Sequence, residues 1–155
     1  MSDEFDIRIE IDSEIPNLTV IIKNNELNKD VEGVMAAVQE YAENRIPNIP
    51  AFQKDSMVIL PQPQIIRFFI DGRKVMAQTR QGLYEVRKPL KEIEDMLDET
   101  VFVRISKSEI VNLSMVKNFD FSINGTIGVL LVNGEKTYVA RRRVKEVKWI
   151  LMGRK

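Results

Sequence analysis

The sequence contains no cysteine and no histidine. Without cysteine there is no disulfide framework, so a cytoplasmic protein is the simplest expectation. Without histidine the chain lacks the commonest general base, the commonest zinc ligand and every Ser–His nucleophile. It also has neither a glycine-rich phosphate loop nor an acidic metal-binding loop. We therefore expect a protein that is not an enzyme and has no cofactor and no small-molecule substrate.

Long apolar runs are missing too. No run approaches the ~20 residues that span a bilayer, and no signal peptide opens the chain.

The net charge is zero, but residues 1–50 hold four basic and eleven acidic residues, a net charge of −7. Residues 51–155 hold the other 19 basic and 12 acidic residues, a net charge of +7. This asymmetry indicates a polyanionic partner for the basic part, although the two parts could instead attract each other.

The acidic part has the pattern of a small ββα unit. Residues 6–12 alternate, with Ile7, Ile9 and Ile11 on one face, and residues 18–22 form a second apolar run. Apolar residues then recur at helical spacing from Asp30 to about Asn44, which predicts an amphipathic helix with Asn28 or Asp30 as its N-cap. Residues 45–56 contain two prolines and little periodicity, which is typical of a linker. We expect residues 1–50 to be an acidic ββα extension, marginal alone, that supports dimerisation.

Residues 51–155 have the pattern of a mostly β domain of the α+β class. A short helix is expected from Pro89, with Leu90, Ile93 and Leu97 facing inward, and another after residue 144. Gly-containing turns at residues 71–72, 124–125 and 133–134 favour hairpins. The predicted strands are residues 57–60, 65–70, 74–79, 83–86, 102–105, 110–111, 119–123, 127–132 and 137–140.

Three basic segments are candidate nucleic-acid contacts, because Lys and Arg donate to phosphates and guanine, and Asn can recognise adenine. Each segment also has a structural alternative. The segment at residues 104–112 could be a solvated strand edge with Asn112 capping a turn. The second segment, residues 141–143, could be an exposed helix start, and the third, residues 73–74, an ordinary polar turn. For the second segment that alternative is electrostatically poor, since cations are unfavourable at a helix N-terminus. The candidates are Arg104, Ser106, Lys107, Ser108 and Asn112; then Arg141, Arg142 and Arg143; and finally Arg73 and Lys74.

The acidic run between residues 92 and 99 could be mistaken for a metal site. Its carboxylates alternate with apolar residues at helical spacing, which predicts the solvated face of a helix. The run comprises Glu92, Glu94, Asp95, Asp98 and Glu99.

Taken in order, residues 57–153 resemble the LytTR DNA-binding domain of bacterial transcription regulators. The resemblance is carried by the hairpin at residues 65–79, the helix at 89–97, the string FVRISKSEIVNL at 102–113, Val132-Asn133-Gly134 and Val139-Ala140-Arg141-Arg142-Arg143. It implies an elongated fold of stacked antiparallel sheets with two short helices. It also implies that loops, and no recognition helix, enter successive major grooves of double-stranded DNA.

The resemblance also suggests roles for individual residues. Lys107 and Arg142 match base contacts, Arg73 and Lys74 match the first contacting loop, and Arg104 and Asn112 match positions that shape a loop. Many family members have His where Ser106 stands and Ser where Ala140 stands, so the phosphate contact there differs and a sequence preference does not carry over.

The family domain commonly follows a phosphoacceptor receiver domain, for which residues 1–50 are too short. We therefore expect a stand-alone regulator that is not controlled by phosphorylation. It would be a homodimer on paired sites, and the resemblance makes a regulatory membrane protein a candidate partner. The alternative is a protein-interaction module on the same β-scaffold that does not bind DNA.

Overall fold

The computed structural model describes residues 5–153, and the chain divides between Ala42 and Glu43 into two units. Helix α1 (Lys29–Asn44) confirms the helix predicted in the acidic part. The side-chain oxygen of Asn28 accepts a hydrogen bond from the Val31 N–H at 3.1 Å, so Asn28 caps the helix as expected.

The two strands predicted before α1 are wrong, since no residue of the segment 5–28 is in a strand. Ile7, Ile9 and Ile11 alternate as a strand would, but all three are exposed. Two strands without a third strand or an apolar cover are marginal in water, so alternation alone does not form a sheet here.

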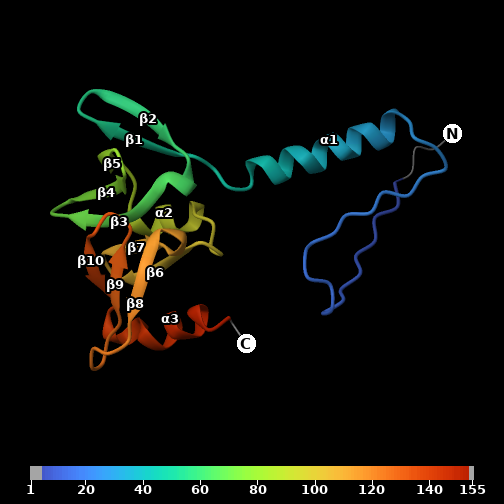
Figure 1. The fold of residues 1–155 in the computed structure, drawn as a ribbon. Helices are drawn as coiled ribbons and strands as arrows, with labels where there is room; N and C mark the ends of the chain where they lie inside the picture. The colour runs from blue at the N-terminus through green and yellow to red at the C-terminus, as the bar shows by residue number, and fades with distance from the viewer. Residues whose placement is uncertain (1–4, 154–155) are drawn as a thin grey trace. The chain divides into compact units, whose positions relative to one another are not determined.

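The second unit contains a seven-stranded sheet in which every pairing is antiparallel (Figure 1). The strand order is β2-β1-β5-β4-β3-β7-β6. The helix α2 (Leu90–Met96) lies between β5 and β6 in the chain and starts after Pro89, as predicted. The strands are β1 (Ile49–Gln53), β2 (Ser56–Leu60), β3 (Ile65–Asp71), β4 (Lys74–Thr79), β5 (Gly82–Val86), β6 (Phe102–Ser106) and β7 (Glu109–Asn112).

A three-stranded antiparallel sheet follows, with the order β10-β9-β8. It consists of β8 (Val116–Asp120), β9 (Gly128–Leu131) and β10 (Lys136–Tyr138). The final helix α3 (Val144–Leu151) confirms the expected C-terminal helix. Short 3-10 turns precede β3, β8 and α3: η1 (Gln62–Gln64), η2 (Leu113–Met115) and η3 (Arg141–Arg143). The mostly β, antiparallel fold class is thus confirmed.

Two apolar cores lie on opposite faces of the large sheet, because neighbouring residues of a strand point to opposite sides. Ile110 of β7 belongs to the core that includes Phe68 and, from α2, Ile93. The next residue, Val111, belongs to the core shared with the small sheet and with Val147 of α3. The large sheet is therefore held from both sides where β3, β7 and β6 lie.

Two predicted segments differ from the structure. The expected linker at residues 45–56 contains β1, in which Ile49 and Ala51 are fully buried. The strand expected at residues 119–123 lies three residues earlier as β8, because the Asp120 carboxylate accepts hydrogen bonds from the Ser122 N–H and hydroxyl and turns the chain.

Candidate nucleic-acid interface

The turn between β6 and β7 is held by the side chain of Arg104. Its Nε donates to the Ser106 carbonyl at 2.7 Å, and its Nη2 donates to the Lys107 carbonyl at 2.6 Å. Its Nη1 lies 3.2 Å from a carboxylate oxygen of Glu94 on α2. The side chain is 14% exposed. Arg104 is therefore a support for the turn, with its donors directed at the turn and at α2.

Two serines complete the same turn. The Ser106 hydroxyl accepts from the Ser108 N–H at 3.2 Å, and the two hydroxyl oxygens are 3.3 Å apart. Between them, Lys107 is exposed at the end of the turn. A fixed backbone thus presents one lysine and two neighbouring hydroxyls to solvent.

Two backbone hydrogen bonds bring the three predicted basic segments together. The Ile70 N–H donates to the Ser108 carbonyl at 3.0 Å, which joins the end of β3 to the β6–β7 turn. The Ala140 N–H donates to the Ile105 carbonyl at 2.8 Å, which joins the start of the arginine triplet to β6. We call the exposed residues of these segments the basic face: Arg73, Lys74, Lys107, Arg141 and Arg142.

The arginine triplet forms η3, directly before α3. Arg141 and Arg142 are exposed, and the Arg141 side chain packs beside Gly125 in the β8–β9 loop. Gly125 has a φ of +80°, and a Cβ there would meet Arg141 Nε at 3.6 Å. Arg143 is less available, because it is partly buried and its Nη1 lies 3.9 Å from Glu146. Among the described residues, Arg143 Nε is buried without a hydrogen-bond partner.

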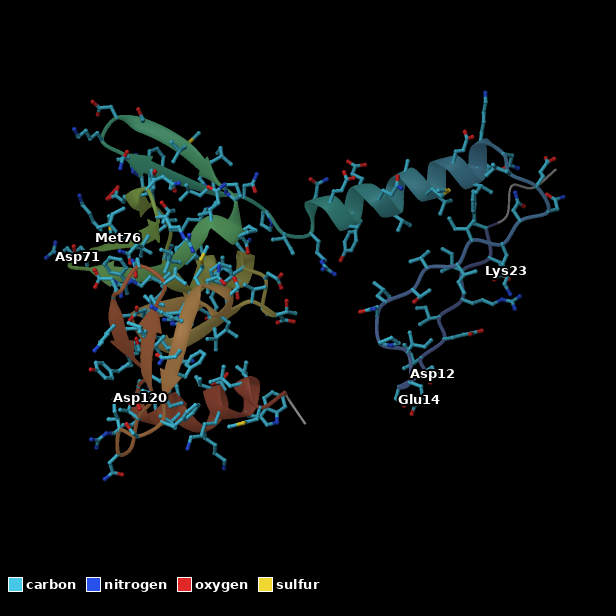
Figure 2. All side chains as sticks on the ribbon, viewed as in Figure 1. Asp12, Glu14, Lys23, Asp71, Met76 and Asp120 are labelled. Carbon is cyan, nitrogen blue, oxygen red and sulfur yellow. The ribbon has the colours of Figure 1, made fainter. Side chains whose placement is uncertain are left out.

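The β3–β4 hairpin carries the third basic segment, with Asp71 at its outer end (Figure 2). Gly72 adopts a φ of +64°, which the tight turn requires. Arg73 is exposed, whereas Lys74 Nζ lies 3.6 Å from Glu85 on β5. The hydrogen bond from Arg87 lowers the pKa of Glu85, and the charge of Lys74 lowers it further. Glu85 is thus a stable anion that offsets part of the Lys74 charge.

Asn112 is fully buried at the end of β7. Its amide nitrogen donates to the Ile65 carbonyl at 2.8 Å, and its oxygen accepts from the Ser114 N–H at 2.9 Å and the Ser114 hydroxyl at 2.6 Å. With no exposed surface, Asn112 cannot touch a nucleic acid as placed. The buried position does not fit the predicted direct contact, and it fits the loop-shaping role that the resemblance implies for Asn112.

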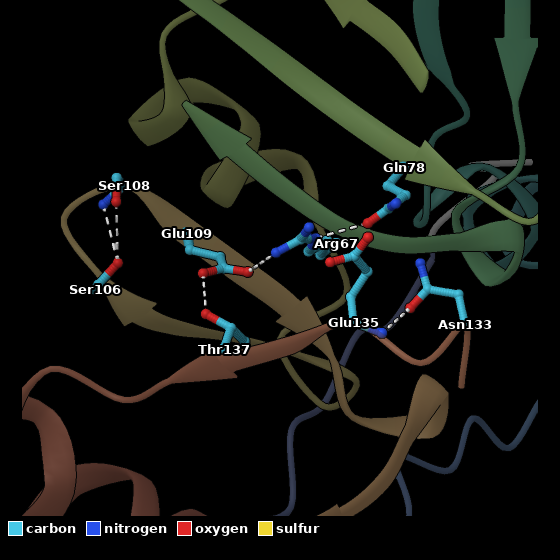
Figure 3. Close-up of polar contacts among 8 residues, drawn as sticks. All are labelled: Arg67, Gln78, Ser106, Ser108, Glu109, Asn133, Glu135 and Thr137. Atoms are coloured by element: carbon cyan, nitrogen blue, oxygen red, sulfur yellow. Dashed lines mark hydrogen bonds and ion pairs between the residues drawn. The ribbon is translucent and has the colours of Figure 1, made fainter. Parts of the chain in front are cut away.

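A polar network that the sequence patterns do not predict joins β3, β4, β7 and β10 (Figure 3). The Arg67 Nε donates to Gln78 at 2.7 Å, and its Nη1 contacts the Glu109 carboxylate at 2.8 Å. The other Glu109 oxygen accepts from the Thr137 hydroxyl of β10. Glu109, a carboxylate at the start of the apolar strand β7, is a sequence signal for a buried cation. Its partners Arg67 and Thr137 lie 42 and 28 residues away in the chain, so no local sequence pattern identifies them.

The acidic run is the solvated face of α2 at Glu92, Glu94 and Asp95, as predicted, with Ile93 buried beneath it. Asp98 and Glu99 lie beyond the end of the helix at Met96, where the Asp98 carboxylate accepts hydrogen bonds from the Thr100 N–H and hydroxyl. Over residues 5–153, no group of three or more acidic side chains is arranged to hold a metal ion. None of the helices within residues 5–153 has the length and apolar character of a membrane-spanning segment.

Comparisons with known proteins show which proteins this chain is similar to. The chain is 31% identical over 120 residues to the transcriptional regulatory protein LytR of Staphylococcus aureus (strain bovine RF122 / ET3-1), covering 77% of this chain and 49% of that protein. It is 29% identical over 122 residues to an uncharacterised HTH-type transcriptional regulator of the same strain, covering 79% of this chain and 81% of that protein. The chain thus spans about half the length of the LytR relatives.

The fold is also similar to a solved structure, the LytTr DNA-binding domain of a methyl-accepting/DNA response regulator from Bacillus cereus. The TM-score is 0.64 at 20% identity, over 69% of this chain and 97% of that one. The family model of the LytTr DNA-binding domain matches residues 55–152. These residues include every strand from β2 to β10, both α2 and α3, and the whole basic face. The chain therefore belongs to the LytTr DNA-binding domain family.

Proposed function

We propose that this protein is a sequence-specific, double-stranded DNA-binding transcriptional regulator whose basic face contacts the DNA. The observation that carries the proposal is the pair of hydrogen bonds from Ile70 to Ser108 and from Ala140 to Ile105. Both bonds support the proposal because they join the strands and turns that carry the three basic segments. A cluster of exposed cations on fixed loops suits a polyanion whose phosphates recur at regular spacing.

Lys107 and Arg142 are the proposed base contacts, since both are exposed and each belongs to a segment held by backbone hydrogen bonds. Arg73, Lys74, Arg141 and the hydroxyls of Ser106 and Ser108 are the proposed phosphate contacts. Loops on the edge of the β-structure would enter successive major grooves. Arg104 and Asn112 would act by holding these loops.

Two further parts of the proposal concern the setting. A homodimer would place two basic faces on paired sites. The protein would act in the cytoplasm, where a regulatory membrane protein is a candidate partner.

The proposal is tested by selection from a pool of random duplexes, followed by fluorescence anisotropy at ~50 and ~200 mM salt. We expect enrichment of a paired motif and an affinity that falls as salt rises. Replacing a phosphate-contacting cation should reduce the slope of log affinity against log salt by about 0.9. Failure to bind any duplex at low salt would refute the proposal and favour a protein-interaction module.

A matched pair of variants localises the binding surface. Lys107→Ala removes a cation from the basic face, whereas Arg80→Ala removes one from the β4–β5 turn, at the opposite end of β4 from Lys74. Both side chains are exposed. Loss of binding in the first variant alone supports the basic face, and equal losses would indicate binding through overall charge.

A further inference from the structure

The strand β2 has an open edge. Among residues 5–153, β1 is the only strand paired with β2, so β2 ends the seven-stranded sheet. The β1–β2 hairpin closes with Gln53 opposite Ser56. Because hydrogen-bonded and non-hydrogen-bonded pairs alternate, Met57 and Ile59 occupy non-hydrogen-bonded positions. Their backbone N–H and C=O groups therefore point away from β1. Pro50, which has no N–H, lies opposite Ile59, as this alternation requires.

This edge lacks the features that usually prevent strand addition, which are charged residues, proline and bulges. Residues 56–60 contain no charged residue, and the β1–β2 register is continuous. Met57 and Ile59 are 58% and 51% exposed and share one face of the sheet. The opposite edge, β6, is different: it has a register shift after Arg104, and Ala140 hydrogen-bonds to Ile105.

We propose that β2 pairs antiparallel with β2 of a second copy, on a two-fold axis through Val58. Met57 would then lie opposite Ile59 of the second copy, and both residues have the outward-pointing backbone groups that such a pair needs. No charged residues would oppose each other along the strand. The four exposed Met57 and Ile59 side chains of the two copies would pack on the same face, which removes apolar surface from water.

This inference deepens the homodimer part of the proposed function, on which it rests, by naming the contact surface. It makes the strand edge the dimer contact, in place of the acidic extension at residues 1–50. The β3–β4 hairpins and β6–β7 turns of the two copies would then belong to one continuous sheet, which would set the separation of the two basic faces and the spacing of paired DNA sites.

The test is sedimentation equilibrium of the 155-residue chain over a concentration series. The wild type should have twice the chain mass of 17.9 kDa. Ile59→Lys adds a charge to the edge, and Ile59→Pro removes the outward N–H without adding a charge. Both should have a mass of 17.9 kDa. Leu83→Lys is the matched control, since Leu83 is 44% exposed on the same face but lies on the interior strand β5, and it should stay dimeric.

A wild type that stays monomeric at every concentration would overturn the inference. So would dimers of both Ile59 variants, which would place the contact elsewhere, for example in residues 5–28. Circular dichroism and the thermal midpoint confirm that each variant is folded. DNA binding is measured separately by anisotropy, so a dimer that binds no DNA refutes the DNA-binding proposal and leaves the strand contact standing.

Discussion

The guanidinium of Arg104 donates to the carbonyl oxygen of Lys107 at 2.6 Å, so one basic residue fixes the backbone that presents another. Arg104→Lys keeps the charge but loses the planar fork that reaches both turn carbonyls. We expect weaker DNA binding and a loss of about 1–3 kcal/mol in the free energy of unfolding. Anisotropy and urea denaturation measure the two effects. Unchanged binding in a destabilised Arg104→Lys protein would show that the turn geometry is unimportant for DNA.

The exposed Arg142 side chain gives a prediction about sequence preference. If it contacts a base, Arg142→Ala should cost about 1–3 kcal/mol of binding free energy and relax the preference at one position of the motif. Anisotropy against duplexes that differ at single positions measures this, with Arg80→Ala as the control. An equal loss on every duplex would instead assign Arg142 to a phosphate.

The burial of Asn112 predicts a structural defect. Asn112→Ala leaves the buried Ile65 carbonyl without its donor and Ser114 without its acceptor. The free energy of unfolding should fall by about 1–3 kcal/mol in urea denaturation. Asn118→Ala, at an exposed position of β8, should cost much less. A fully stable Asn112→Ala protein that fails to bind DNA would restore a direct contact for this residue.

The ion pair of Arg67 with Glu109 joins β3 to β7, and both side chains are mostly buried, at 14% and 11% exposed. Glu109→Leu leaves the Arg67 charge buried and should cost about 3–5 kcal/mol. Arg67→Met combined with Glu109→Leu should recover much of that loss, because no unpaired charge remains. A double-mutant cycle by urea denaturation tests this. Additive losses would show that the pair does not act as a unit.

The lowered pKa of Glu85 predicts a pH-dependent stability. A carboxyl group whose pKa is lower in the folded state stabilises the fold above its unfolded pKa, and this contribution is lost as pH falls through the folded pKa. Glu85→Gln should therefore have a lower thermal midpoint than the wild type at neutral pH. The difference should shrink in acid below the ordinary glutamate pKa. A difference that is the same at every pH would contradict this account.

Most elements of the second unit could be predicted because their signals are local. Pro89 and the inward spacing of Leu90 and Ile93 were sufficient for α2, and Asp71-Gly72 was sufficient for the β3–β4 turn. The N-terminal strands failed for the opposite reason, since alternation specifies a strand only where a sheet is available to receive it. The sequence did not predict β1, because a proline usually argues against a strand. Pro50 is tolerated in β1 because it lies at a position where no N–H is needed for a hydrogen bond to β2.

The sequence by itself determined the kinds of residue at the candidate interface and the elements that carry them, since charge, turn residues and periodicity act over a few residues. Only the tertiary structure decided which of those residues are available. For Arg104 and Asn112 the sequence left both a DNA contact and a loop-shaping role open, and the fold directs their donors to its own carbonyls. Hydrogen bonds between residues far apart in the chain, such as Ala140 to Ile105, depend on how the sheets pack, and no local pattern encodes them.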